Sequence, residues 1–239
     1  MRQAVSVREN YFEIMDGIAD AAGRAGRRPG EIALVAVTKF VDEARIREAL
    51  DCGVTDAGES RVQELTGKLP LFGEYGARVH LIGQLQTNKV KYVIGKVASI
   101  QSVDRSALAA QISREAVKNN VVQDVLVEVN VGREPQKGGV MPEELFPFLE
   151  TISALPNVRL RGLMCIPPDV GEGEVRGHFA RMRELFDKAA ALGLPGTRVD
   201  TLSMGMSGDY RAAVAEGSNM VRIGAALFGA RPVEPGGKA

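Results

Sequence analysis

Lys39 is the residue whose type and position point most directly to chemistry. It follows an apolar run rich in valine, which is typical of a buried strand in a parallel sheet. A lysine at the carboxyl end of that strand places an amine at the edge of an apolar core, where α/β barrels keep their active groups. Desolvation there favours the neutral amine, which is nucleophilic. The alternative is a lysine at a strand end whose amine simply reaches solvent.

Two turns that contain glycine follow the seventh and eighth expected strands. They are residues 203–205 and Gly224-Ala225, at the strand ends where a barrel often binds phosphate through backbone N–H groups. Either turn alone is weak support, because most such turns only reverse the chain. Together with Lys39 they indicate a phosphorylated carbonyl compound. Pyridoxal 5′-phosphate (PLP) fits this pattern best, and the sugar phosphate of an aldolase comes second.

Other residues that could do chemistry have simpler interpretations. A serine nucleophile elbow needs glycine where Asp209 stands, so a serine hydrolase is not expected. We interpret His80 as a hydrogen-bonded histidine of the barrel and not as a general base. Cys52 and Cys165 lie far apart in the sequence, and with only two histidines no zinc-ligand spacing arises. We therefore expect no metal site and two reduced, buried cysteines.

Strand-like and helix-like segments alternate along the chain and must position these residues. The expected strands are 33–38, 54–57, 78–82, 98–102, 122–131, 158–164, 199–203 and 220–223. The helices expected between and after them are 42–53, 62–69, 89–94, 105–117, 143–152, 174–192, 210–216 and 226–228. This alternation predicts an α/β fold, a single closed (β/α)₈ TIM barrel. An open doubly wound sheet is the runner-up, but no Gly-x-Gly-x-x-Gly follows any strand.

The ends of the chain and two helix starts complete this outline. Apolar residues spaced three or four positions apart over 7–18 predict an amphipathic helix, so that 1–29 pack on the barrel. Asp42 and Asp104 are expected to be N-caps. The tail, 231–239, is rich in proline and glycine and is expected to be flexible. Residues 1–239 are thus predicted to form one domain.

The composition excludes several classes of partner. Thirty basic residues balance thirty acidic ones, which argues against a general surface for nucleic acid or membrane. No uncharged apolar stretch is long enough to span a bilayer, and the first residues lack the apolar segment of a secretion signal. We therefore expect a cytoplasmic protein with neither a nucleic acid nor a membrane as its partner.

Six stretches of the chain, spread over residues 30–230, resemble the pyridoxal phosphate homeostasis protein family. They are LVAVTK at 34–39, GESRVQE at 58–64, HLIGQLQTNK at 80–89, RGLM at 161–164, LSMGMS at 202–207 and MVRIG at 220–224. The resemblance implies a barrel of PLP fold type III, related to the N-terminal barrel of alanine racemase. It also implies that PLP is held on Lys39 as a Schiff base.

The resemblance assigns roles to the residues at the other strand ends. Ser203 and Gly224 match positions that hold the phosphate. Met204, judged by its residue type and not by the resemblance, is either a packing residue or one that lines the cofactor site. Ser60 stands where the family often has asparagine near the phenolic oxygen of PLP, and its shorter side chain calls for a bridging water. Ala225 replaces a threonine or serine, which leaves only its backbone N–H for the phosphate. We expect an intact cofactor site that binds PLP more weakly.

Arg222 matches the arginine that faces the pyridine nitrogen of PLP. A cation there disfavours protonation of that nitrogen, so that PLP becomes a poorer electron sink. The alternative is a structural arginine paired with a carboxylate such as Glu59 or Asp200.

The resemblance implies a PLP carrier and leaves two enzymatic alternatives. The likeness to alanine racemase covers only the barrel. In that enzyme the second catalytic base comes from an additional β domain of the partner subunit. We expect no room for such a domain in 239 residues. We therefore expect a monomer with no catalytic residues and little or no turnover, which supplies PLP to apo PLP enzymes. A PLP-dependent racemase is the first alternative, and a class I aldolase acting through Lys39 is the second.

Overall fold

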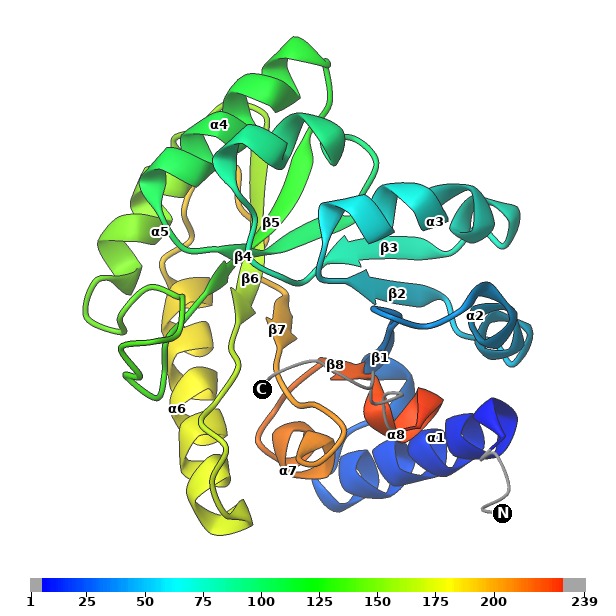
Figure 1. Cartoon of the computed structure of the whole chain (residues 1–239). Coiled ribbons are helices and arrows are strands. Elements are labelled where there is room, and N and C mark those ends of the chain that lie inside the picture. The colour runs from blue at the N-terminus through cyan, green and yellow to red at the C-terminus, as the bar shows by residue number, and fades with distance from the viewer. Residues whose placement is uncertain (1–5, 230–239) are drawn as a thin grey trace.

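A closed barrel of eight parallel strands forms the centre of the protein (Figure 1). The computed structural model describes residues 6–229. The strands are β1 Ala33–Val37, β2 Asp56–Glu59, β3 Arg78–Leu81, β4 Ser99–Val103, β5 Gln123–Glu128, β6 Val158–Met164, β7 Thr201–Ser203 and β8 Met220–Ile223. They pair in chain order, and β8 closes onto β1. The predicted (β/α)₈ barrel is confirmed, and the open doubly wound sheet is wrong.

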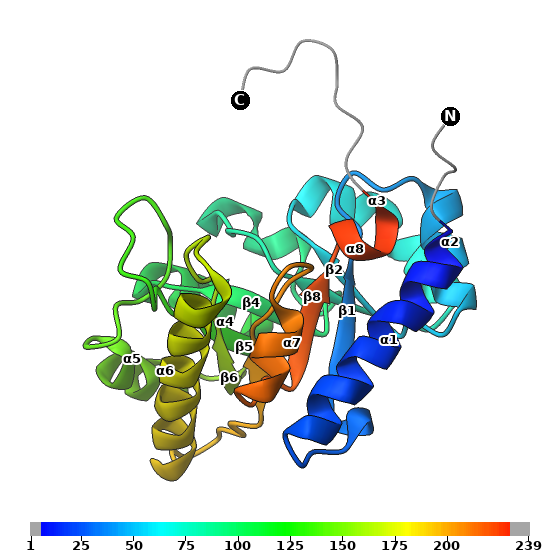
Figure 2. The same cartoon turned by 90° about the horizontal axis from the view of Figure 1, so that it is seen from below.

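Helices surround the barrel, and Figure 2 shows α6, α7 and α1 side by side outside the strands. The α-helices are α1 Val7–Arg24, α2 Glu43–Asp51, α3 Val62–Glu74, α4 Ser106–Lys118, α5 Leu145–Ser153, α6 Glu172–Ala191, α7 Tyr210–Ala215 and α8 Ala225–Phe228. Two 3₁₀ helices, η1 Pro29–Glu31 and η2 Thr87–Tyr92, complete the set for the described residues. The core between strands and helices is apolar, as layered α/β packing requires.

The N-terminal helix α1 packs on the barrel as its apolar spacing predicts. Val7, Ile14 and Ile18 are buried, and α1 contacts α2, α7 and α8. Gly17 permits the close approach to α7, because a Cβ atom at that position would lie 2.2 Å from the hydroxyl of Tyr210. The expected flexible tail, 231–239, lies outside the described residues.

The structure corrects several element boundaries. β2 starts two residues later than expected, because the N–H of Val54 donates to the carbonyl of Ala49 and so completes the C-terminal turn of α2. β5 ends at Glu128, because Val129 pairs with Val140 in an isolated bridge and no longer belongs to the regular strand. Asp104 is not an N-cap as predicted: Arg105 occupies that position, and the two side chains form an ion pair of 2.7 Å. The expected N-cap at Asp42 is confirmed.

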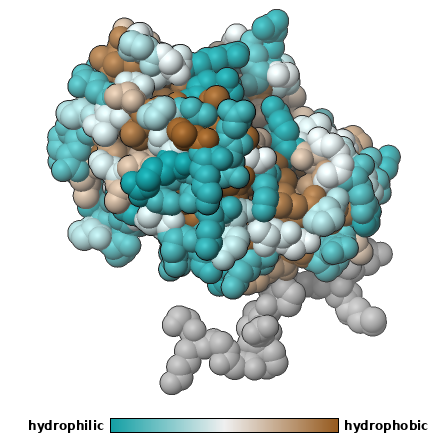
Figure 3. Space-filling model, turned by 90° about the horizontal axis from the view of Figure 1, so that it is seen from above, coloured by the Kyte–Doolittle hydropathy of each residue, from teal (hydrophilic) through white to brown (hydrophobic). Residues whose placement is uncertain are grey.

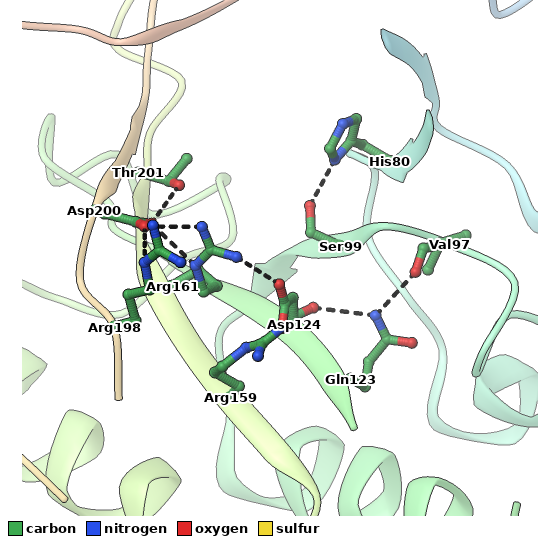
Figure 4. A network of polar contacts seen from close by, with 10 residues as sticks. All are labelled: His80, Val97, Ser99, Gln123, Asp124, Arg159, Arg161, Arg198, Asp200 and Thr201. Atoms are coloured by element: carbon green, nitrogen blue, oxygen red, sulfur yellow. Dashed lines mark hydrogen bonds and ion pairs between the residues drawn. The ribbon is translucent and has the colours of Figure 1, made fainter. Parts of the chain in front are cut away.

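A polar network connects residues in and beside the N-terminal parts of β5, β6 and β7 (Figure 4). Arg161 bridges Asp124 and Asp200, and Arg159 and Arg198 add one ion pair each to these two carboxylates. In this fold the N-terminal face of the barrel serves stability while the opposite face carries chemistry.

The face in Figure 3 shows hydrophobic side chains in small groups between polar ones. No helix among residues 6–229 is long and apolar enough to cross a bilayer.

Candidate functional site

Lys39 and the turn after β8 meet at one edge of the barrel. β1 and β8 are neighbours, with Ala36 opposite Ile223, so the chain leaves both strands at the same end. There Lys39, Gly224 and Ala225 line a cavity of about 130 Å³, which we call the Lys39 cavity. The structure thus brings together the predicted nucleophile and the second predicted phosphate turn.

Arg222 lies buried beneath this edge in a network that crosses the barrel interior. Its Nη1 donates to Ser203 Oγ over 2.7 Å, and its Nη2 donates to the carbonyl oxygen of Cys165 over 2.8 Å. Ser203 Oγ in turn donates to Gln101 Oε1 over 2.8 Å. Because β4 and β7 are not neighbours in the sheet, this last bond spans the interior. The hydroxyl expected to hold phosphate is therefore also the group that orients Arg222.

No carboxylate neutralises Arg222 in the way the structural alternative required. Glu59 pairs with Lys68, Asp200 pairs with Arg161 and Arg198, and no ion pair among residues 6–229 involves Arg222. Burial lowers the pKa of the Arg222 guanidinium, although the nearby acidic groups act in the opposite direction. Since a guanidinium remains charged in proteins, the site holds a buried cation whose partner is not a paired carboxylate.

Two other predicted residues lie away from the Lys39 cavity. Met204 is fully buried in the apolar core, and its N–H donates to the carbonyl of Met220. Ser60 is half-buried at the end of β2, where its backbone lies against Gly83. A Cβ atom at Gly83 would lie 2.4 Å from the Ser60 carbonyl oxygen, so glycine allows this contact between the ends of β2 and β3.

A larger cavity of about 930 Å³ adjoins the other side of α8. It is lined by Ser207 and Ala226, among others, whereas Ala225 faces the Lys39 cavity. Ser207 Oγ accepts a hydrogen bond from the N–H of Ala226 over 3.1 Å. The sequence analysis gave Ser207 no role of its own, although it closes the stretch 202–207 that resembles the family. Its place four residues after Ser203, in the loop after β7, was the available signal.

Glu128, at the carboxyl end of β5, is a second residue that the sequence analysis missed. It is buried and accepts a hydrogen bond from Gln84 Nε2 over 2.7 Å. Burial raises the pKa of Glu128 to about 7, and the negative charge of Asp104 acts in the same direction, whereas Arg222 and Gln84 oppose it. A buried carboxyl group with such a pKa at a barrel mouth is a feature of functional sites.

His80 is a hydrogen-bonded histidine of the barrel, as expected. Its Nε2 lies 2.8 Å from Asp56 Oδ1, and its Nδ1 lies 2.8 Å from Ser99 Oγ. The carboxylate partner, Asp56, was not foreseen. Figure 4 shows His80 and Ser99 facing each other across β3 and β4.

Cys52 and Cys165 form no disulfide bond, and only Cys165 is buried. Cys165 is buried, which raises the pKa of its thiol to about 12, while Cys52 is half-buried instead of buried as predicted. No group of three or more His, Cys, Asp or Glu side chains in the described part of the chain could hold a metal ion.

Comparisons with known proteins cover almost the whole chain. Residues 21–232 match the family described as alanine racemase, N-terminal domain. A protein of Aquifex aeolicus named pyridoxal phosphate homeostasis protein is 46% identical over 227 residues, which cover 93% of this chain and 97% of the relative. The crystal structure of an unknown protein from Bifidobacterium adolescentis matches with a TM-score of 0.90 and 39% identity, over 93% of this chain and 94% of the other. PipY of Synechococcus elongatus, solved with PLP bound, matches with a TM-score of 0.78 and 35% identity, over 89% of this chain and all of PipY.

Proposed function

Since the chain belongs to the alanine racemase N-terminal domain family and, within it, to the pyridoxal phosphate homeostasis proteins, we propose that it binds PLP and keeps it available with little or no turnover. The observation that carries this proposal is the placement of Lys39 and the Gly224–Ala225 turn in one cavity at the C-terminal edge of the barrel. An amine and a phosphate-binding turn are the two groups that PLP requires.

The residues present fit the cofactor. Lys39 Nζ would hold it covalently through the aldehyde group of the cofactor, with one water molecule released. Gly224 and Ala225 would receive the phosphate through backbone N–H groups, and Ser60 would face the phenolic oxygen through water. Arg222 tests this fit. It is a buried cation that is not paired with a carboxylate, so it can interact with the lone pair of a ring nitrogen or with an anion.

The proposal of low turnover rests on Arg222. PLP acts in enzymes as an electron sink for carbanions, most strongly when its ring nitrogen is protonated. Arg222 is fixed by Ser203 and the Cys165 carbonyl, so its charge cannot swing away, and a cation beside the ring nitrogen disfavours that protonation. Such a site supports holding and releasing the cofactor better than it supports racemisation.

Partners, assembly and location form part of the same proposal. Apo PLP enzymes would be the recipients of the cofactor, and the protein would act as a monomer. Both cysteines are unpaired, as is usual for proteins of a reducing compartment, and this supports a cytoplasmic location.

A transfer experiment separates the carrier from the enzyme. The PLP-loaded protein is mixed with an apo PLP enzyme whose activity reports transfer, and in parallel with alanine in deuterated water. We expect recovery of the apo enzyme's activity and no deuterium at the α-carbon beyond that produced by free PLP. Catalytic incorporation of deuterium would contradict the carrier proposal and favour the racemase-like alternative. A preparation in which the cofactor never binds would favour the aldolase.

A further inference from the structure

The turn that carries Lys39 has an unusual backbone. It runs from Thr38 to Val41 and is closed by a hydrogen bond of 3.1 Å from the Val41 N–H to the Thr38 carbonyl. Phe40 sits in it with a φ of 60°, in the left-handed region, although it is neither glycine nor asparagine. Bulky residues in that region are outliers and persist only where the surroundings hold them. We call residues 38–41 the Lys39 turn.

Helix α3 holds the turn on the N-terminal side of Lys39. Lys68 Nζ donates to the Thr38 carbonyl over 2.7 Å and to Glu59 Oε1 over 2.8 Å. The Thr38 hydroxyl donates to the same Glu59 oxygen over 2.6 Å. Glu59 is fully buried, and the side chain of Lys68 is 13% exposed, so this pair is shielded from solvent.

The same helix holds the turn on the C-terminal side. Glu64 Oε2 accepts a hydrogen bond of 2.9 Å from the Phe40 N–H, and the Arg61 guanidinium lies 4.7 Å from the centre of the Phe40 ring. Lys68 Nζ lies 3.6 Å from Glu64 Oε2 and so connects the two sides. Both peptide neighbours of Lys39 are therefore fixed by two side chains of α3, one turn of helix apart.

We propose that Lys68 and Glu64 are positioning residues, which hold the Lys39 turn in its strained form so that the Lys39 amine projects toward the cofactor site. This inference rests on the proposed function. Bond formation between Nζ and an aldehyde needs the two atoms to be held close and aligned, and a small displacement of the lysine backbone slows that step. Binding of the phosphate and ring does not depend on the turn in the same way.

The variants separate positioning from general stability. Glu64→Ala removes the acceptor of the Phe40 N–H, and Glu64→Gln restores a neutral one. Glu74→Ala is the matched control, because Glu74 lies at the other end of α3 and, within residues 6–229, its one ion pair is with Arg47 on the surface. Lys68→Met leaves the buried Glu59 carboxylate without its cationic partner and can prevent folding. The double variant Lys68→Met with Glu59→Gln, which also removes the buried negative charge, is therefore made as well.

Three quantities are measured for each variant: the rate of covalent PLP attachment by absorbance and borohydride trapping, the affinity for pyridoxine 5′-phosphate, and amide hydrogen exchange over residues 38–41 without cofactor. Pyridoxine phosphate has no aldehyde and reports binding alone. We expect Glu64→Ala and the Lys68 variants to slow attachment at least about tenfold and to speed exchange, with unchanged affinity for pyridoxine phosphate. We expect Glu64→Gln to recover part of the rate and Glu74→Ala to match wild type.

Wild-type attachment rates and wild-type exchange in Glu64→Ala and the Lys68 variants would overturn this inference alone. Equal losses in attachment and in pyridoxine phosphate affinity would also overturn it, because they indicate a general structural role. A wild-type protein that binds no PLP on Lys39 would instead overturn the proposed function, and hydrogen exchange would still report whether α3 holds the turn.

Discussion

Glu128→Gln is predicted to stabilise the protein, and increasingly so as the pH rises. Burial and the negative charge of Asp104 raise the pKa of Glu128 from 4.5 to about 7. Between these values the unfolded chain releases a proton that the folded protein retains, so raising the pH favours unfolding. A tenfold change in proton affinity is worth about 1.4 kcal/mol. The rise of the Glu128 pKa from 4.5 to about 7 therefore lowers the free energy of unfolding by about 3 kcal/mol once the pH exceeds both values.

Urea unfolding followed by circular dichroism tests this at two pH values. Glutamine keeps the shape of the side chain and an oxygen that accepts the hydrogen bond from Gln84. We expect the variant to be more stable than wild type by about 3 kcal/mol near pH 8 and by about 1 kcal/mol near pH 5. Glu150→Gln, on the exposed face of α5, makes the same charge change as a control. An advantage of Glu128→Gln that is the same at both pH values, or absent, would refute the reasoning.

Three further predictions concern the site and the barrel. Ala225→Thr adds a hydroxyl at the predicted phosphate turn. In a titration of the apo protein with PLP it should tighten binding about fivefold, the contribution of one ordinary hydrogen bond. Equal affinities of wild type and variant would show that a hydroxyl at this position does not contribute to PLP binding. Asp56→Asn should cost about 2 kcal/mol in urea unfolding at neutral pH, because hydrogen bonds from three side chains outweigh burial and lower the pKa of Asp56 from 3.8 to about 2. This stability is present above about pH 4 and is lost as the pH falls toward 2, so wild type and variant should converge in acid. Gly162→Ala should give insoluble or unfolded protein, because the new Cβ atom would lie 1.8 Å from the Thr201 carbonyl oxygen; a soluble variant with a wild-type melting temperature would contradict the packing of β6 on β7.

The sequence predicts the barrel well because its signals are local and repeated. Each strand is short and contains apolar residues, and each is followed by a polar turn and a helical pattern, so alternation alone indicates a parallel barrel. Boundaries fail where a particular local contact of the backbone or of a side chain decides them, because apolar periodicity does not show such contacts. The late start of β2 follows from a backbone hydrogen bond between Val54 and Ala49. The N-cap of α4 is Arg105, and Asp104 forms an ion pair with it instead of capping the helix.

The candidate site is predictable in part for the same reason. Lys39 and Gly224 stand at strand ends, and the barrel order makes those two ends neighbours. The role of Ser203 as an anchor for Arg222 was not predictable, because it depends on Gln101 from a strand across the interior. The raised pKa of Glu128 was also not predictable from the sequence. It results from burial and from the negative charge of Asp104, and neither produces a recognisable sequence pattern.

The most direct test of the central claim is to locate the residue that binds PLP. The purified protein is loaded with PLP, its visible spectrum is recorded before and after borohydride reduction, and the reduced protein is digested for peptide mass mapping, with Lys39→Ala treated in parallel. We predict a yellow protein that bleaches on reduction and a phosphopyridoxyl group on Lys39 as the main adduct, with the wild-type chromophore lost in Lys39→Ala. A protein that stays colourless with added PLP, or an adduct that maps to another lysine while Lys39 remains unmodified, would contradict the account.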